Sequence, residues 1–134
     1  GFYLYDADRN RKVDPEVTAL VEQVSKEHGR TRHAIGADEV VERCMYALVN
    51  EGAKILEEGI AARPLDIDMI WIFGYGFPRY RGGPMHWADE LGLANLLERL
   101  EHYYQSADRD WLEPAPLLRK LVKEGKTFRA WAAA

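Results

Sequence analysis

The sequence predicts an all-α fold, a single domain of about five or six helices built around one long central helix. Three observations support this prediction: apolar residues recur at helical spacing, Asp and Pro residues stand where helices can begin, and no stretch alternates as a half-buried strand would. With 134 residues, 47% of them hydrophobic, the chain can bury one core but is too short for two comfortable domains.

The helical domain is expected to span residues 14–134, after a polar, aromatic-led lead-in segment at residues 1–13. Asp14 can cap a first helix, Pro15 suits its first position and Glu16 favours its positive end. Four apolar residues follow at helical spacing, namely Val17, Leu20, Val21 and Val24. Gly29 can end this helix.

The central helix is predicted from about Asp38 to Glu58, and Gly59 stands near its end. One apolar stripe follows its length, comprising Val40, Val41, Cys44, Met45, Leu48, Val49, Ile55 and Leu56. At a rise of 1.5 Å per residue the helix is about 30 Å long, which is roughly the width of a small domain. We therefore expect it to be the spine of the fold.

Four shorter helices are predicted after it, one of which begins at Pro84. Asp66 or Asp68 can cap a helix that ends near Phe73, although an apolar run this short also fits a buried strand. Another stripe comprises Leu93, Leu96, Leu97, Leu100, Tyr103 and Tyr104. A last helix begins at two prolines, buries four side chains and ends before a glycine: Pro114, Pro116, Leu117, Leu118, Leu121, Val122 and Gly125.

Residues 74–89 are expected to form a shaped loop and then a helix, because four glycines and two prolines crowd this run. Pro84 can begin the helix. The backbone at Gly82 and Gly83, with Arg79 and Arg81 beside it, can cradle an anion such as a phosphate. A tight structural loop with two solvated arginines is the alternative that we favour.

Composition excludes several classes of function. The net charge is −4 and no Lys/Arg run occurs, which argues against nucleic acid and an anionic membrane surface as partners. The longest apolar run, residues 69–73, is far too short for a membrane span. Cys44 is the only cysteine, which indicates a reducing, intracellular location, and its place on the apolar stripe predicts a buried thiol rather than a nucleophile. No histidine pair has metal-ligand spacing, so we expect no metal site.

Aromatic and acidic residues around the loop leave alternatives open. Six aromatic side chains can line an acyl pocket or, as we favour, form a satellite of the core or an interface: Trp71, Phe73, Tyr75, Phe77, Tyr80 and Trp87. The glycines at 74 and 76 lack the third glycine of a dinucleotide-binding fingerprint. The carboxylate pairs Glu57–Glu58 and Glu42–Glu51 are expected to be solvated or interfacial charges.

Several motifs together resemble a known family. The run at residues 74–89, the long helix at 39–60, and the segments 63–69, 114–118 and 125–128 occur in the order found in the 3-hydroxyacyl-CoA dehydrogenase C-terminal domain of multifunctional fatty-acid β-oxidation enzymes. The resemblance covers roughly residues 1–128. The opening Gly-Phe-Tyr-Leu-Tyr-Asp resembles the closing motif of the preceding domain in that family, so we expect the chain to be cut from a longer polypeptide.

The resemblance implies a helical fold like the C-terminal domain of 6-phosphogluconate dehydrogenase. The parent enzymes use NAD to oxidise L-3-hydroxyacyl-CoA to 3-oxoacyl-CoA, with the cofactor and a His/Glu pair on a Rossmann domain. Two related helical domains follow, and this chain resembles the second. It is then expected to bind no NAD itself and to carry no catalytic residue. It would pack on the Rossmann and first helical domains and help to shape the acyl-CoA cleft, with Phe73 as the residue that approaches the substrate.

The same resemblance implies a cytoplasmic location in bacteria and a peroxisomal one in eukaryotes, with enoyl-CoA hydratase/isomerase domains as further parts of the parent. A fragment cut from its partner domains is also expected to self-associate at high concentration. A purely structural helical dimerisation module is the alternative. The helical domain of another two-domain hydroxyacid dehydrogenase is a third interpretation, against which the Gly82-Gly83-Pro84 motif argues.

Glu42 carries the expectation that this domain is non-catalytic. Related catalytic domains have Phe-Val-Val-Asn-Arg at the start of the long helix, whereas this chain has Glu39-Val-Val-Glu42-Arg43. An amide both donates and accepts hydrogen bonds, whereas an ionised carboxylate only accepts and would repel a developing oxyanion. We therefore expect Glu42→Gln to leave the turnover of a full-length enzyme within a few-fold of the parent.

Overall fold

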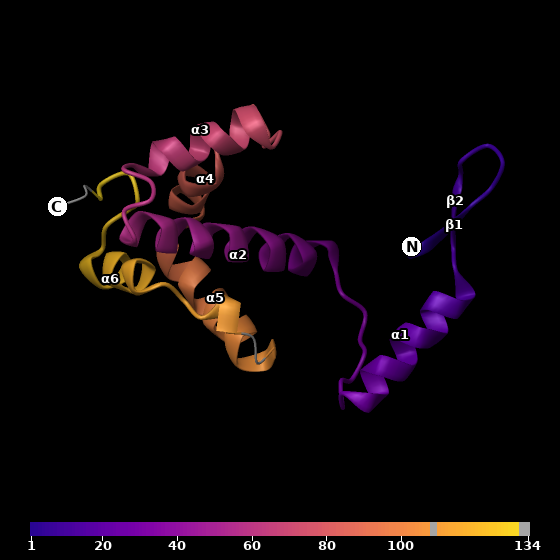
Figure 1. The fold of residues 1–134 in the computed structure, drawn as a ribbon. Helices are drawn as coiled ribbons and strands as arrows, with labels where there is room; N and C mark the ends of the chain where they lie inside the picture. Colours follow the sequence, from indigo (N-terminus) through magenta and orange to yellow (C-terminus); the bar gives the residue numbers. More distant parts are fainter. Residues whose placement is uncertain (108–109, 132–134) are drawn as a thin grey trace. The chain divides into compact units, whose positions relative to one another are not determined.

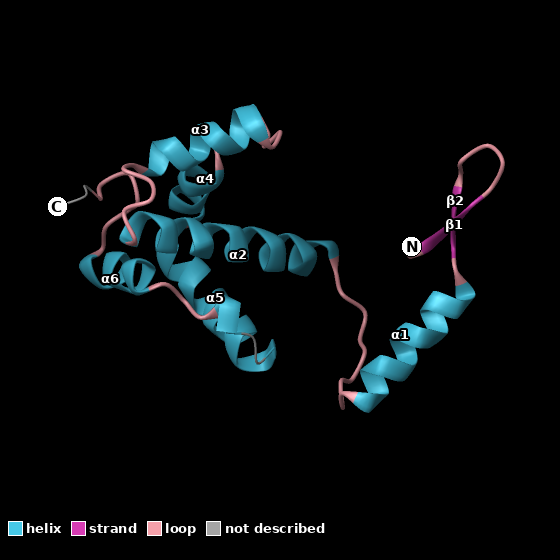
Figure 2. Cartoon of the chain, in the orientation of Figure 1, coloured by secondary structure: helices cyan, strands magenta, loops and turns pink. Residues whose placement is uncertain are grey.

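The computed structural model describes residues 1–107 and 110–131, and the chain divides into two compact units, Gly1–Ile35 and Gly36–Ala134 (Figure 1). Nearly all of the second unit that the structure describes is helical or in the loops between helices (Figure 2). The division lies later in the chain than the expected boundary between residues 13 and 14, so the first helix groups with the lead-in segment.

The first unit contains a β-hairpin that the sequence analysis did not predict. Strands β1 (Tyr3–Tyr5) and β2 (Arg11–Val13) are antiparallel, with Tyr3 opposite Val13. The Asp6 carboxylate holds the turn because it accepts the backbone N–H groups of Asp8 and Asn10 at 3.1 and 2.8 Å. This small sheet is an addition to the predicted helices, and each of its strands is too short to show an alternating pattern.

Helix α1 (Pro15–Glu27) begins as predicted, because the Asp14 carboxylate accepts the backbone N–H of Glu16 at 2.9 Å. Its apolar stripe is nevertheless uncovered. None of its residues is buried, and Leu20 is 57% exposed.

The second unit is built around α2 (Ala37–Glu57), which confirms the predicted central helix. The remaining elements are α3 (Pro64–Gly74), the 3-10 turn η1 (Arg79–Arg81), α4 (Pro84–Leu91), α5 (Leu93–Ala107), the 3-10 turn η2 (Asp110–Leu112) and α6 (Pro116–Glu124). Helix α2 contacts all four of the other helices in this unit, and α3 contacts α4 most extensively. The predicted all-α class is thus confirmed for this unit.

Burial along α2 is uneven. Val49, Ala53 and Leu56 in its C-terminal half are buried in the core. Gly52 lets α4 approach closely, since a Cβ atom there would lie 2.6 Å from the Met85 sulfur. In the N-terminal half, by contrast, Val40 is 50% exposed and Cys44 is also exposed. The prediction that the Cys44 thiol is buried is therefore wrong, because periodicity identifies an apolar face without showing what covers it.

Helices α5 and α6 complete the core with Leu96, Leu100, Leu118 and Leu121. Asn50 is the fully buried polar side chain that joins α2 to the segment before α6. Its amide nitrogen donates to the Glu113 carbonyl at 2.8 Å, and its oxygen accepts the Ala115 N–H at 2.8 Å. Both ends of one amide are thereby satisfied by backbone that is more than 60 residues away.

Substituting Asn50→Asp should lower the free energy of unfolding by about 2 kcal/mol or more, because the buried carboxylate cannot donate to the Glu113 carbonyl. Urea denaturation followed by circular dichroism measures the change. The matched control is Asn95→Asp on the exposed side of α5, which should alter stability by less than about 0.5 kcal/mol. Equal effects of the two substitutions would contradict the role given to Asn50.

Candidate functional site

The α3–loop–α4 region is organised by a buried carboxylate. Asp68 in α3 is 4% exposed, and its Oδ1 accepts the Met85 N–H at 2.7 Å. The His86 N–H lies 3.3 Å from Oδ2. These N–H groups belong to the first turn of α4, which has no side-chain cap of its own. Asp68 thus supplies from another helix the acceptor that a helix N-terminus requires.

The residues before α4 are the ones that this contact requires. Pro84 stands at the first helical position, where its missing N–H costs nothing. Gly83 has φ of 100°, and a Cβ atom there would lie 2.4 Å from the Asp68 side chain. Burial raises the pKa of the Asp68 carboxyl, and the hydrogen bonds from Met85 and His86 oppose that rise.

Two sequence expectations are corrected at this point. Asp68 does not cap its own helix, which begins after Arg63 without a side-chain cap. The backbone of Gly82 and Gly83 does not hold an external anion either, because the chain's own Asp68 carboxylate occupies the N-terminus of α4. The favoured alternative, a tight structural loop, agrees with this geometry.

The two arginines of the loop lie against aromatic rings. The Arg79 guanidinium carbon is 5.3 Å from the centre of the Phe73 ring, and that of Arg81 is 5.4 Å from the Tyr80 ring. Both distances suit cation–π contacts.

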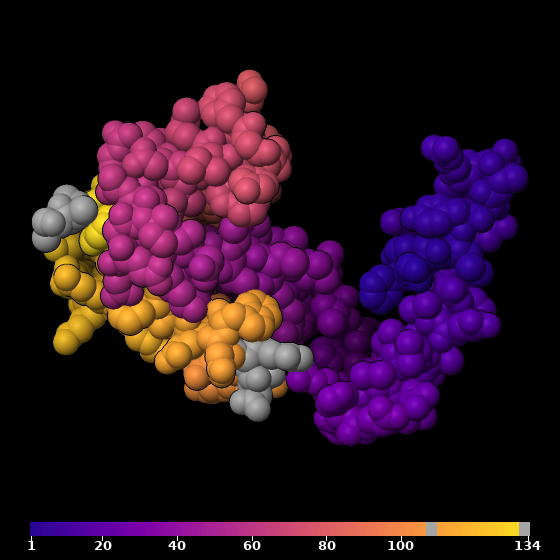
Figure 3. Space-filling model, in the orientation of Figure 1, coloured from indigo at the N-terminus to yellow at the C-terminus, as the bar shows by residue number. Residues whose placement is uncertain are grey.

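Phe73, the residue predicted to approach substrate, lies in the last turn of α3 and is 65% exposed. Met69 and Ile70 on the same helix are also exposed, so α3 presents an apolar face. In Figure 3, α3 lies at the surface of the second unit. We call Met69, Ile70 and Phe73 the α3 face. Trp87 instead packs partly buried against the core, with its ring 6.1 Å from that of Tyr46. The six aromatic residues therefore do not converge on one pocket.

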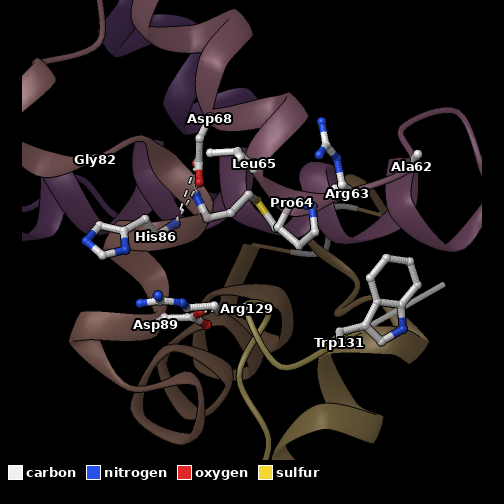
Figure 4. A pocket seen from close by; sticks show the side chains of 11 residues that line it. Ala62, Arg63, Pro64, Leu65, Asp68, Gly82, His86, Asp89, Arg129 and Trp131 are labelled. Atoms are coloured by element: carbon white, nitrogen blue, oxygen red, sulfur yellow. Dashed lines mark hydrogen bonds between the residues drawn. The ribbon is translucent and has the colours of Figure 1, made fainter.

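A cavity of about 740 Å³ lies elsewhere, between the first turn of α3, α4 and the segment after α6 (Figure 4). We call it the α3–α4 pocket. Asp68, His86 and Asp89 contribute polar groups, and Arg129 and Trp131 come from the C-terminal segment. Phe73 is not among its lining residues.

Asp89 fixes the C-terminal wall of this pocket. Its carboxylate accepts the backbone N–H groups of Phe128 and Arg129 at 2.8 and 2.9 Å. Phe128 is fully buried, so Asp89 anchors the segment that carries Arg129 and Trp131. Sequence reasoning missed these residues, since Asp89 and Phe128 stand 39 positions apart and share no local motif.

Glu42 in α2 is held by two residues of α5. Its Oε2 accepts two hydrogen bonds from Arg99, at 3.0 and 2.6 Å, and a short one from the Tyr103 hydroxyl. The Tyr103 hydrogen bond lowers the pKa of the Glu42 carboxyl, and Arg99 lowers it further, while burial opposes them. Burial, followed by Glu42, raises the pKa of Tyr103. Of the two alternatives expected from the sequence, solvated or interfacial charges, Glu42 does not fit the first, whereas Glu57 and Glu58 are exposed.

Within residues 1–107 and 110–131, no group of three His, Cys, Asp or Glu side chains is placed to hold a metal ion. Over the same residues, no helix has both the length and the apolar character needed to cross a membrane.

Comparison with known proteins matches residues 40–132 to the family described as the 3-hydroxyacyl-CoA dehydrogenase C-terminal domain. The peroxisomal bifunctional enzyme of Danio rerio is 49% identical over 128 residues, which cover 93% of this chain and 18% of that protein. The fatty acid oxidation complex subunit alpha of Shewanella amazonensis is 43% identical and is matched over 17% of its length by 96% of this chain. The chain thus spans less than a fifth of the curated relatives it matches.

A solved structure, the (S)-3-hydroxybutyryl-CoA dehydrogenase of Ralstonia eutropha, is similar to this chain with a TM-score of 0.60 and 30% sequence identity. The similarity covers 87% of this chain and 41% of that one.

Gly83→Ala should destabilise the second unit by more than about 2 kcal/mol, because the new methyl group combines positive φ with a clash against Asp68. Gly59→Ala is the matched control: its φ is 72°, yet nothing lies within 4 Å of the added atom. The control should cost only the backbone strain, about 1 kcal/mol. Thermal denaturation of both variants distinguishes the two cases, and equal losses would show that Asp68 does not restrict position 83.

Glu42→Gln should destabilise the chain at neutral pH and lose this effect in acid. The folded-state pKa of Glu42 lies below its ordinary value of 4.5, so its contribution to stability is present above pH 4.5 and disappears as the pH falls through the folded-state value. Urea denaturation of both proteins between about pH 7 and 3 measures the difference. Glu58→Gln, at an exposed position, should show no such dependence. A difference that grows toward acid pH would refute the arrangement.

Proposed function

Because the chain belongs to the 3-hydroxyacyl-CoA dehydrogenase C-terminal domain family, we propose that it is the second, non-catalytic helical domain of an NAD-dependent 3-hydroxyacyl-CoA dehydrogenase in fatty-acid β-oxidation. The parent reaction is oxidation of L-3-hydroxyacyl-CoA to 3-oxoacyl-CoA. NAD and the general base belong to a Rossmann domain in the rest of the polypeptide. This domain packs on its sister helical domain and helps to shape the acyl-CoA cleft.

The non-catalytic assignment rests on the hydrogen bonds that Glu42 forms within its own domain. It stands where related catalytic domains have an Asn beside the substrate, and here it binds Arg99 and Tyr103 of its own domain. Its Oε2 already accepts three hydrogen bonds from the domain itself, and an ionised carboxylate offers a substrate no donor. Its contacts join α2 to α5, which is a packing role.

The exposed apolar surfaces support the proposed partners. The stripe of α1, the N-terminal half of α2 and the α3 face all leave large apolar side chains in solvent. Apolar patches of this kind ordinarily mark surfaces that contact another protein. In the parent they would face the other domains of the polypeptide, and in the isolated chain they favour self-association. The parent would be peroxisomal in a eukaryote, as the name of the Danio rerio relative suggests, and cytoplasmic in a bacterium.

A purely structural dimerisation module is the second candidate, since the same apolar surfaces would suit it. The two candidates differ at Phe73. In the proposed function its exposed ring contacts the acyl chain, whereas a dimerisation module has no substrate contact at this position.

In the full-length enzyme, Phe73→Ala should raise KM for 3-hydroxyacyl-CoA several-fold and leave kcat within about twofold, because an apolar contact made equally in ground and transition states affects binding alone. Steady-state assays with a short and a long acyl chain measure this, and the effect should be larger for the long chain. Trp111→Ala removes an aromatic side chain of similar exposure outside the α3 face and should leave KM unchanged. Unchanged kinetics in Phe73→Ala, with normal stability, would favour the structural module.

A further inference from the structure

The α3–α4 pocket has the dimensions and walls of a small-molecule site. Its volume of about 740 Å³ lies within the range of roughly 300–1,000 Å³ that is usual for ligand pockets. Pro64 and Leu65 line one side, and the indole of Trp131 lines another (Figure 4). The first of these walls is aliphatic and the second is a flat ring, which together suit an apolar body.

The acceptors of the pocket are already committed. Asp68 accepts the N–H groups of Met85 and His86, and Asp89 accepts those of Phe128 and Arg129. Four backbone dipoles therefore offset the charge of the two carboxylates. Arg63 is likewise engaged, because its guanidinium binds Asp66 at 2.6 Å.

The N–H donors of the Arg129 side chain, by contrast, are not committed to a partner in the described part of the chain. Within the described part of the chain, its guanidinium forms no ion pair, and only its backbone N–H is bonded to Asp89. The pocket lining also includes His86, whose side chain is drawn with that of Arg129 in Figure 4. A planar fork of donors is the group that matches a carboxylate in two parallel hydrogen bonds.

We propose that the α3–α4 pocket binds a small organic carboxylate with a flat or aliphatic body, whose carboxylate pairs with Arg129 and whose body rests on Trp131. Phe73 does not line this pocket. Asp89 positions the segment that carries Arg129 and Trp131, because its carboxylate accepts the backbone N–H of Arg129.

The experiment compares two probes of the same shape, 4-phenylbutyrate and its neutral amide, by NMR titration of the isotope-labelled 134-residue chain. Saturable shifts are expected at the Trp131 indole N–H and at the backbone of Met85 and Arg129. The carboxylate should bind about tenfold more tightly than the amide, which is the ratio that one charge-assisted pair supplies.

Matched variants separate the two contacts. Arg129→Gln keeps the backbone bond to Asp89 and should abolish the preference for the carboxylate, whereas Arg119→Gln on α6 should retain it. Trp131→Ala should weaken both probes, whereas the control Trp111→Ala should weaken neither. The proposal fails if no saturable shift occurs by about 10 mM, if the two probes bind equally to the parent chain, or if Arg129→Gln retains the preference. Circular dichroism of each variant confirms that it is folded.

Discussion

The buried Asp68 carboxylate is the contact on which the arrangement of the second unit depends. It lies in α3 but satisfies the first N–H groups of α4, so it fixes one helix against the other. Glycine at 83 is required because a side chain would strike this carboxylate, and proline at 84 leaves the next two N–H groups as the ones to be capped. Through α4, the same contact sets the wall of the α3–α4 pocket and the position of Asp89.

Apolar side chains are not buried to the same extent in all parts of the second unit. Its C-terminal helices enclose a core around Leu96, Leu100 and Leu118, whereas Val40 and Val41 of α2 and the α3 face remain in solvent. Burying apolar surface stabilises a protein by about 25 cal/mol per Å². The exposed apolar faces therefore contribute this stabilisation only when a partner covers them. The polar network of Glu42, Arg99 and Tyr103 secures this less-buried part of α2 to α5.

Local signals in the sequence predicted the helices well, and tertiary contacts account for what they missed. Asp14 with Pro15, and Gly125 after the last helix, acted as their types predict, because capping depends on neighbours within one turn. Asp68 was assigned to the wrong helix, since the N–H groups that it accepts lie 17 and 18 residues later. The partners of Glu42 lie 57 and 61 residues away, and those of Asp89 about 40, so neither the network nor the pocket has a pattern that a sequence can display.

The separations of these contacts along the chain also imply an order of assembly. The contact between Asp68 and Met85 spans only 17 positions of the chain and closes at a small entropic cost, so α3 and α4 can form a hairpin early in folding. The two hydrogen bonds of Asn50 span 63 and 65 residues and require α2, α5 and the approach to α6 to be in place already. We therefore expect the hydrogen bonds of Asn50 to form late in folding, after the rest of the unit has collapsed. In a nascent polypeptide, this would leave the helices after α2 exposed until the segment around Ala115 has emerged.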